Sequence, residues 1–122
     1  MARILIIDDS EVMRNLLVDF LTDLGHETDA TGDSEDGIKM ALEGQYEVCF
    51  CDLHIPKKSG FDVYCEVSPV RPELQFVVTD SLPDRLAEQA RESGVKYCLR
   101  KPFDLNQVRE VLNQVLKPVK TP

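Results

Sequence analysis

The sequence predicts an α/β fold: one domain built around a parallel sheet with helices on both of its faces. Along the 122 residues, apolar periodicity switches repeatedly between a strand-like and a helix-like repeat. Hydrophobic residues make up 43% of the chain, which is ordinary for a globular protein of a single domain. Strands that alternate with helices pack as a doubly wound parallel sheet, so we expect this architecture.

Five strands and five helices are expected in alternation. The expected strands are residues 3–7, 27–31, 46–51, 75–79 and 97–100. The first and third of these are continuous apolar runs, as expected of strands that are buried on both faces. The expected helices are residues 11–24, 61–68 and 83–92, one helix that begins after Asp33 or Ser34, and one that runs from its cap Asp104 to Pro118.

Glycine and proline mark several of the expected helix ends. Gly25 and Gly94 are suited to the position just after a helix, and Pro83 to a first helical turn. Pro69 and Pro72 interrupt the stretch before the fourth strand, so we expect a short third helix. The first helix is expected to bury one broad apolar stripe, made of Val12, Met13, Leu16, Leu17, Phe20, Leu21 and Leu24.

Polar side chains stand where four of the expected strands end. Asp8 and Asp9 follow the first strand, Asp52 the third, Thr79 the fourth and Lys101 the fifth. Parallel sheets of this kind place their functional sites outside the carboxyl ends of the strands. Four separate stretches of sequence are therefore expected to converge on one rim of the sheet.

The three aspartates point to a bound cation and to phosphoryl chemistry. Two carboxylates about 4 Å apart repel each other by on the order of 4 kcal/mol at an effective dielectric of 20, and a divalent cation relieves this repulsion. Mg²⁺ accepts one or two carboxylates together with phosphate oxygens. An aspartate is a competent nucleophile that forms an aspartyl phosphate. Lys101 would supply a further positive charge, Thr79 a hydroxyl donor, and Pro102 a restricted backbone beside the lysine.

Four stretches resemble the receiver domain of two-component response regulators: Ile6-Ile7-Asp8-Asp9-Ser10, then Asp52-Leu53-His54-Ile55-Pro56 with Gly60 eight residues after Asp52, then Thr79, then Lys101-Pro102-Phe103. The resemblance covers nearly the whole chain. It implies a flavodoxin-like (βα)5 fold with strand order 2-1-3-4-5. It further implies a receiver domain over residues 1–117, with residues 118–122 as a C-terminal tail or the start of a linker.

The resemblance also implies how the acidic residues are used. Asp52 is the expected phosphoacceptor. Asp9 and Asp52 are expected to bind Mg²⁺ directly, together with the main-chain carbonyl of His54, and Asp8 to act on the metal mainly through water. The chain is then not an enzyme in its own right, but a phosphoacceptor that assists its own phosphorylation and dephosphorylation.

The expected partners follow from the same resemblance. Thr79 and Lys101 would grip a phosphoryl group donated by a sensor histidine kinase or a phosphotransfer protein. The response would be a shift of the surface formed by the fourth helix, the fifth strand and the fifth helix. An output domain or partner protein would read this surface, which could also support a weak homodimer.

Five residues are expected to tune or transmit the switch: His54, Asp80, Ser81, Tyr97 and Cys98. Asp80 follows Thr79 where the family usually has a small residue, and its carboxylate would repel a phosphoryl group if it faced the pocket. Cys98 stands at the family's aromatic switch position, while Tyr97 should face the other side of the strand. We therefore expect slower phosphorylation and a smaller conformational change than is usual, unless a partner assists.

Two other classes of protein remain open. A pseudo-receiver would keep the fold as an interaction module and barely use phosphorylation, and Asp80 and Cys98 favour it while the intact acidic set opposes it. A Mg²⁺-dependent phosphatase needs a cap and a second aspartate two residues after the nucleophile, where this chain has His54. Taken alone, Asp8 and Asp9 could also be a solvated strand end that caps a helix.

Composition argues against several partners and compartments. The formal net charge of −8 disfavours direct binding to a nucleic-acid backbone. The chain has no run of 18 apolar residues that could span a membrane, and its N-terminal segment lacks a signal-peptide pattern, so we expect a cytoplasmic protein. Cys49, Cys51, Cys65 and Cys98 are expected as reduced residues in or near the core, and His26 as a solvated loop residue.

Overall fold

The computed structural model describes residues 1–81 and 85–116 of the chain. Within these residues, five parallel strands form one sheet in the order β2-β1-β3-β4-β5, so the predicted fold class and strand order are confirmed. The strands are β1 (Arg3–Ile7), β2 (Glu27–Thr31), β3 (Val48–Asp52), β4 (Gln75–Asp80) and β5 (Tyr97–Arg100). The helices are α1 (Glu11–Asp23), α2 (Ser34–Glu43), α3 (Gly60–Val67), α4 (Arg85–Glu92) and α5 (Leu105–Leu116).

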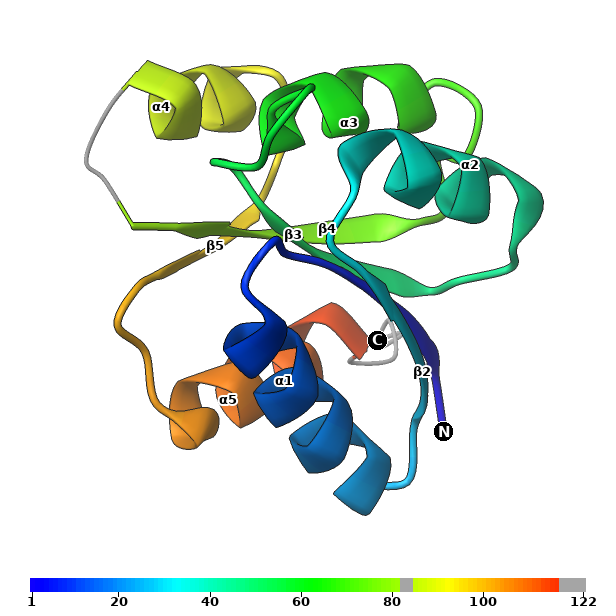
Figure 1. The fold of residues 1–122 in the computed structure, drawn as a ribbon, viewed down its shortest axis with the longest axis vertical. Coiled ribbons are helices and arrows are strands. Elements are labelled where there is room, and N and C mark those ends of the chain that lie inside the picture. The colour runs from blue at the N-terminus through cyan, green and yellow to red at the C-terminus, as the bar shows by residue number, and fades with distance from the viewer. Residues whose placement is uncertain (82–84, 117–122) are drawn as a thin grey trace, which may run out of the picture.

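The sheet lies between two layers of helices. Figure 1 shows α1 and α5 on one face and α2, α3 and α4 on the other. Alternate residues of β1 serve the two layers: Ile4 and Ile6 pack with α1 and α5, while Leu5 and Ile7 pack with α2 and α3. Because both faces of the central strands are covered, the side chains of β1 from Ile4 to Ile7 and of all of β3 are buried, as the apolar runs predicted.

The register of the strands aligns their carboxyl ends. Asp52 pairs with Thr79 across β3 and β4, and the Asp8 N–H donates to the Thr31 carbonyl oxygen at 3.1 Å just beyond β1. The loops that follow β1, β3, β4 and β5 therefore leave the sheet at one edge. This edge carries the polar residues that the sequence placed after the strands.

Side-chain caps begin α1, α2, α3 and α5. Ser10 caps α1 by accepting the Met13 N–H at 3.2 Å, and Asp33, not Ser34, caps α2. Ser59 and Asp62 form a capping box at the start of α3. Asp104 accepts the Gln107 N–H at 2.8 Å, so its predicted cap is confirmed. The positions of Pro83, Pro118 and the expected tail at 118–122 lie outside the described residues.

Gly60 is required by the close approach of two backbone segments. A Cβ atom at this position would overlap the main chain of Asp52 and Leu53. We expect Gly60→Ala to lower the free energy of unfolding by at least roughly 3 kcal/mol, which is the upper end of the usual range for substitutions that over-pack a core. The loss should be this large because the atoms that the new Cβ would meet belong to the backbone and cannot easily move aside. Urea unfolding measures the loss.

Gly25→Ala is the matched control for that substitution. Gly25 has φ of 94°, and no atom outside its own chain neighbours lies within 4 Å of the place that a Cβ would take, so an alanine there meets only backbone strain. Strain of this kind costs about 1–2 kcal/mol. A Gly60→Ala loss no larger than the Gly25→Ala loss would show that the backbone at Asp52 can move aside.

Several predicted details are wrong. The first helix does not bury its whole apolar stripe: Val12 is 80% exposed, Leu16 43% and Leu24 38%, while Leu17 and Leu21 are buried. The predicted stripe was too broad because only one side of this helix packs against the sheet, whereas the neighbouring side faces solvent. The third strand begins at Val48 rather than at residue 46, the fourth extends to Asp80, and α1 and α3 each end one residue earlier than predicted.

Two of the four cysteines also differ from expectation. Cys49 and Cys51 lie buried in β3, but Cys65 and Cys98 are exposed, and none of the four forms a disulfide in the described structure. Tyr97 packs toward the α1–α5 core and Cys98 stands on the opposite side of β5, as strand alternation predicted. Ser81 is exposed directly after β4. None of the described helices is long and apolar enough to cross a membrane.

His26 is not a solvated loop residue. It is partly buried, and its Nδ1 accepts the Ala2 N–H at 2.9 Å. Burial and the nearby N-terminal charge lower the pKa of His26. A histidine whose folded pKa is lowered binds more protons in the unfolded chain, so its contribution to stability is lost as the pH falls through the unfolded value of about 6.5.

We therefore expect His26→Gln to flatten the pH dependence of stability. The free energy of unfolding of the parent should fall between about pH 7.5 and about pH 5.5, and that of His26→Gln should fall less, since glutamine does not titrate there. Urea unfolding at both pH values gives the two slopes. All other side chains are common to both proteins, so identical slopes would mean that His26 is not held neutral by its contact with Ala2.

Candidate functional site

Three carboxylates gather at the carboxyl edge of the sheet. Asp8 follows β1, Asp52 is the last residue of β3, and both are buried, while Asp9 is exposed beside them. Ligand oxygens from the three side chains lie within 4.8 Å of one another. Such an arrangement is unfavourable for three negative charges alone, and it offers the oxygen ligands that hard divalent cations take.

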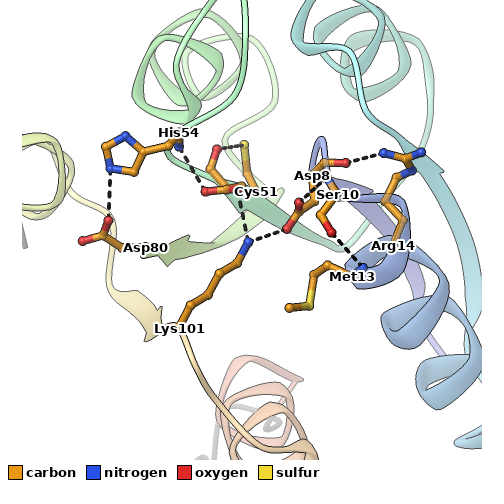
Figure 2. Close-up of polar contacts among 9 residues, drawn as sticks. Asp8, Ser10, Met13, Arg14, Cys51, His54, Asp80 and Lys101 are labelled. Atoms are coloured by element: carbon orange, nitrogen blue, oxygen red, sulfur yellow. Dashed lines mark hydrogen bonds and ion pairs between the residues drawn. The ribbon is translucent and has the colours of Figure 1, made fainter. Parts of the chain in front are cut away.

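Lys101 reaches into the same cluster from the end of β5. Figure 2 shows the Lys101 side chain directed toward Asp8. Its Nζ lies 2.9 Å from Asp8 Oδ2 and 3.2 Å from Asp52 Oδ2, and its side chain is only 17% exposed. Burial alone would lower the pKa of Lys101, but hydrogen bonds and charge attraction from the two aspartates outweigh burial and raise it. One ammonium against three carboxylates leaves two negative charges, which a divalent cation would balance.

The Asp52 carboxylate has a partly desolvated environment. Burial raises the pKa of Asp52, and the hydrogen bond from the His54 main-chain N–H at 3.0 Å and the charge of Lys101 act in the opposite direction. The side chain is thus presented from a fixed position, with the His54 N–H on one of its oxygens and Lys101 on the other. A fixed, partly desolvated carboxylate suits a nucleophile.

Thr79 brings a hydroxyl group to this edge. Thr79 is buried and pairs in register with Asp52, and its Oγ1 has no hydrogen-bond partner among the residues that the structure describes. Leaving a buried hydroxyl unpaired costs roughly 1–3 kcal/mol. The cost is offset if a ligand oxygen accepts the hydroxyl, so Thr79 is an available donor beside the carboxylates.

His54 and Asp80 form a second polar pair next to this cluster. Figure 2 shows the His54 imidazole facing the Asp80 carboxylate, with His54 Nε2 3.2 Å from Asp80 Oδ1. Asp80 is 1% exposed. The Asp80 carboxylate thus faces the imidazole of His54 and does not point to solvent. The sequence left the direction of Asp80 open, since it depends on how the ends of β3 and β4 are placed.

Ser10 and Arg14 support the cluster in ways that the sequence did not indicate. The Ser10 N–H donates to Asp8 Oδ1 at 2.9 Å, and Arg14 Nη1 donates to the Asp8 main-chain oxygen at 2.8 Å. Both residues lie in or beside the first turn of α1, which starts soon after Asp9. The position of Arg14, six residues after Asp8 on a helix start, is the only sequence signal for this contact.

The peptide bond between Lys101 and Pro102 is cis. The sequence predicted that Pro102 would restrict the backbone beside Lys101, but it did not predict whether the peptide bond would be cis or trans. The Lys101 N–H donates to the main-chain oxygen of Asp80 at 2.7 Å, which ties the end of β5 to the end of β4.

This sheet order, with carboxylates and a lysine at its carboxyl edge, defines the receiver class of signalling domains. The chain belongs to the response regulator receiver domain family, whose family model matches residues 4–113. It is similar to the chemotaxis protein CheY of Thermotoga maritima, with 30% identity over 118 residues that cover 94% of this chain and 98% of that protein.

Two further proteins are similar to this chain. The DNA-binding transcriptional regulator NtrC of Azospirillum brasilense is 31% identical over 116 residues, which are 94% of this chain but 24% of that protein. A response regulator receiver domain protein from Clostridium thermocellum has a structure similar to this chain, with a TM-score of 0.89 and 25% identity, covering 95% of this chain and 94% of that one. Receiver domains thus occur both as most of a protein and as one part of a longer one.

Proposed function

We propose that this receiver domain is a phosphorylation switch in which Asp52 accepts a phosphoryl group from a histidine kinase or a phosphotransfer protein. The observation that carries the proposal is the unpartnered Thr79 hydroxyl, buried in register with Asp52 and beside a cluster that also holds Lys101 in the part of the chain that the structure describes. A phosphoryl oxygen would give Thr79 the acceptor that it lacks there. Lys101 would balance part of the added charge.

The transfer is a displacement at phosphorus. A carboxylate oxygen of Asp52 attacks, the bond from phosphorus to the donor breaks, and the donor group leaves with the electron pair of that bond. The product is an aspartyl phosphate. In the reverse direction of the switch, water attacks phosphorus, the bond from phosphorus to Asp52 breaks, and inorganic phosphate leaves while Asp52 regains its carboxylate.

The acidic cluster fits Mg²⁺. Asp9 and Asp52, with the main-chain carbonyl of His54, would hold the ion directly, and Asp8 would act through water. When bound, Mg²⁺ neutralises charge on the phosphoryl oxygens. The three carboxylates and the single ammonium of Lys101 leave two negative charges in this cluster, and this net charge supports the assignment of a divalent cation to the site. Asp8 contributes in a second way, since its oxygen fixes the Lys101 ammonium at 2.9 Å.

The output surface of the proposed switch consists of α4, β5 and α5. A partner protein or output domain would read this surface, which would also be the contact of a weak homodimer. Cys98 lies on it and is exposed, so it offers less apolar area than an aromatic side chain would bury on switching. The pseudo-receiver alternative is not favoured, because the carboxylates, Lys101 and Thr79 lie together at one edge of the sheet.

Incubation of the protein with acetyl phosphate and Mg²⁺, followed by intact mass measurement, tests this function. One added phosphoryl group per chain is the expected result, and removal of Mg²⁺ with a chelator should prevent it. A parent protein that gains no mass over a wide range of acetyl phosphate concentrations would contradict the proposal.

A further inference from the structure

We propose that Ser34 is a positioning residue of the proposed Mg²⁺ site: its buried hydroxyl group fixes the loop that carries the main-chain carbonyl of His54. This β3–α3 loop comprises residues 53–59, between β3 and α3. The inference rests on the proposed function and adds a residue that favours Mg²⁺ over a geometrically less demanding cation such as Ca²⁺.

Ser34 holds the tip of the β3–α3 loop by two hydrogen bonds. It lies in the first turn of α2 and is 0% exposed. Its Oγ donates to the Pro56 main-chain oxygen at 2.9 Å and accepts the Lys58 N–H at 3.1 Å. Between these two residues, Lys57 has a φ of 72°, which is a strained value for a residue other than glycine. Such a conformation persists only where the surrounding structure holds it, and the Ser34 hydroxyl holds the main chain on both sides of Lys57.

The base of the β3–α3 loop is fixed independently of Ser34. The Leu53 N–H donates to the Thr79 main-chain oxygen at 2.9 Å, which joins the loop to the end of β4. The Gly60 N–H donates to the Leu53 main-chain oxygen at 3.0 Å, which closes the loop where α3 begins. Removal of the Ser34 hydroxyl should therefore release the tip of the loop and leave its base in place.

His54 lies between the fixed base and the anchored tip. Its main-chain N–H is held by Asp52 Oδ1 at 3.0 Å. Its carbonyl group belongs to the next peptide bond, toward Ile55 and Pro56, and so lies on the side of the tip. Since that carbonyl is the proposed metal ligand, release of the tip would let the ligand move without changing the position of the Asp52 carboxylate.

The start of α2 also contacts the part of the chain that carries the other proposed ligands. The Asp8 N–H donates to the Thr31 main-chain oxygen at 3.1 Å, and Thr31 Oγ1 accepts the Asp33 N–H at 3.2 Å. Asp33 caps α2 and directly precedes Ser34. The segment from Thr31 to Ser34 thus joins the end of β1, next to Asp9, to the β3–α3 loop. It sets the spacing between the two parts of the chain that would hold the ion.

A fixed spacing matters more for Mg²⁺ than for Ca²⁺. Mg²⁺ requires near-octahedral geometry at short distances, whereas Ca²⁺ accepts a variable number of oxygen ligands in a flexible arrangement. A ligand that occupies the required position for only part of the time lowers the apparent affinity in proportion to that fraction. Release of the loop tip should therefore weaken Mg²⁺ binding more than Ca²⁺ binding.

An exposed ion pair is the rival anchor for the same tip. Lys57 Nζ lies 2.7 Å from Asp33 Oδ2, but the two side chains are 55% and 41% exposed. Exposed ion pairs contribute little because water and salt screen them. We therefore expect Lys57→Gln to keep the parent's ratio of Mg²⁺ to Ca²⁺ affinity, whereas Ser34→Ala should lower this ratio.

The experiment follows the amide NMR signals of the full chain, first without metal and then in separate titrations with Mg²⁺ and Ca²⁺. Without metal, the Lys58 N–H should exchange with solvent about five-fold faster in Ser34→Ala, the change that corresponds to one net hydrogen bond of about 1 kcal/mol. Mg²⁺ affinity should fall by about the same five-fold, and Ca²⁺ affinity by less. Ser34→Cys keeps a side chain of similar shape with a weak hydrogen-bonding group, so it should change in the same direction.

Ser59→Ala is the matched control. It removes a serine hydroxyl from the same loop and breaks the capping box of α3, but it leaves both contacts of Ser34 intact. It should lower the free energy of unfolding, measured with urea in a chelator, and keep the parent affinity for Mg²⁺. This variant separates a loss of stability from a loss of ligand positioning.

The same urea measurements establish which variants are folded, and Ser34→Cys keeps the inference testable if Ser34→Ala does not fold. Parent Mg²⁺ affinity in either folded Ser34 variant overturns the inference. An equal fall for Mg²⁺ and Ca²⁺, or the same fall in Ser59→Ala, also overturns it. A parent protein that binds Mg²⁺ but gains no phosphoryl group from acetyl phosphate would instead contradict the proposed function alone.

Discussion

Asp52→Asn is expected to abolish the phosphoryl gain of the protein in acetyl phosphate and Mg²⁺. The amide has the shape of the carboxylate but is a poor nucleophile, so no aspartyl phosphate can form at this position. Among the residues that the structure describes, Asp52 is the buried carboxylate in contact both with Lys101 at 3.2 Å and with the His54 main-chain N–H. Intact mass, read over the time in which the parent is labelled, measures the difference.

The control for this experiment is Asp62→Asn. Asp62 is a carboxylate in the first turn of α3, where it closes a capping box with Ser59, and it lies outside the acidic cluster. Asp62→Asn should be labelled at the parent rate. A phosphoryl adduct of the parent size in Asp52→Asn would place the acceptor at another residue, with Asp8 and Asp9 the nearest carboxylates to test.

Asp9→Ala is expected to lose Mg²⁺ binding and, with it, phosphorylation. Substituting an outer partner of a metal ligand typically lowers affinity by roughly 10–100-fold, and loss of a direct ligand should exceed that range. The same change removes one of three carboxylates whose oxygens lie within 4.8 Å of one another. Metal-free Asp9→Ala should therefore be at least as stable as the metal-free parent, since repulsion within the cluster is reduced.

Two measurements separate these effects. A Mg²⁺ titration followed by amide NMR signals gives the affinity, and urea unfolding in a chelator gives the metal-free stability. Asp23→Ala, which removes an exposed carboxylate from the far end of α1, should leave both unchanged. If Asp9→Ala binds Mg²⁺ as the parent does, the proposed set of ligands is wrong.

Local sequence determined most of the architecture. The apolar runs at Ile4–Ile7 and in β3 predict strands buried on both faces, and the polar residues that follow them predict the edge on which a site forms. Ser59 and Asp104 indicate helix starts because a short polar side chain can accept the free N–H groups there. These features depend on neighbours a few residues away, which is why the sequence shows them. The strand order came from the family resemblance, and the structure confirms it.

The tertiary structure decided which side chains meet. The contact of Asp80 with His54 joins residues that are 26 positions apart, and it depends on the pairing of β3 with β4. The hydrogen bond from Arg14 to the main chain of Asp8 likewise depends on the angle at which α1 leaves the sheet edge. Val12 and Leu16 share the periodicity of the buried Leu17 and Leu21, yet they are exposed. Periodicity in the sequence indicates that a helix forms. Which of its apolar residues are buried depends on the elements that pack against the helix, and their positions are set only in the folded chain.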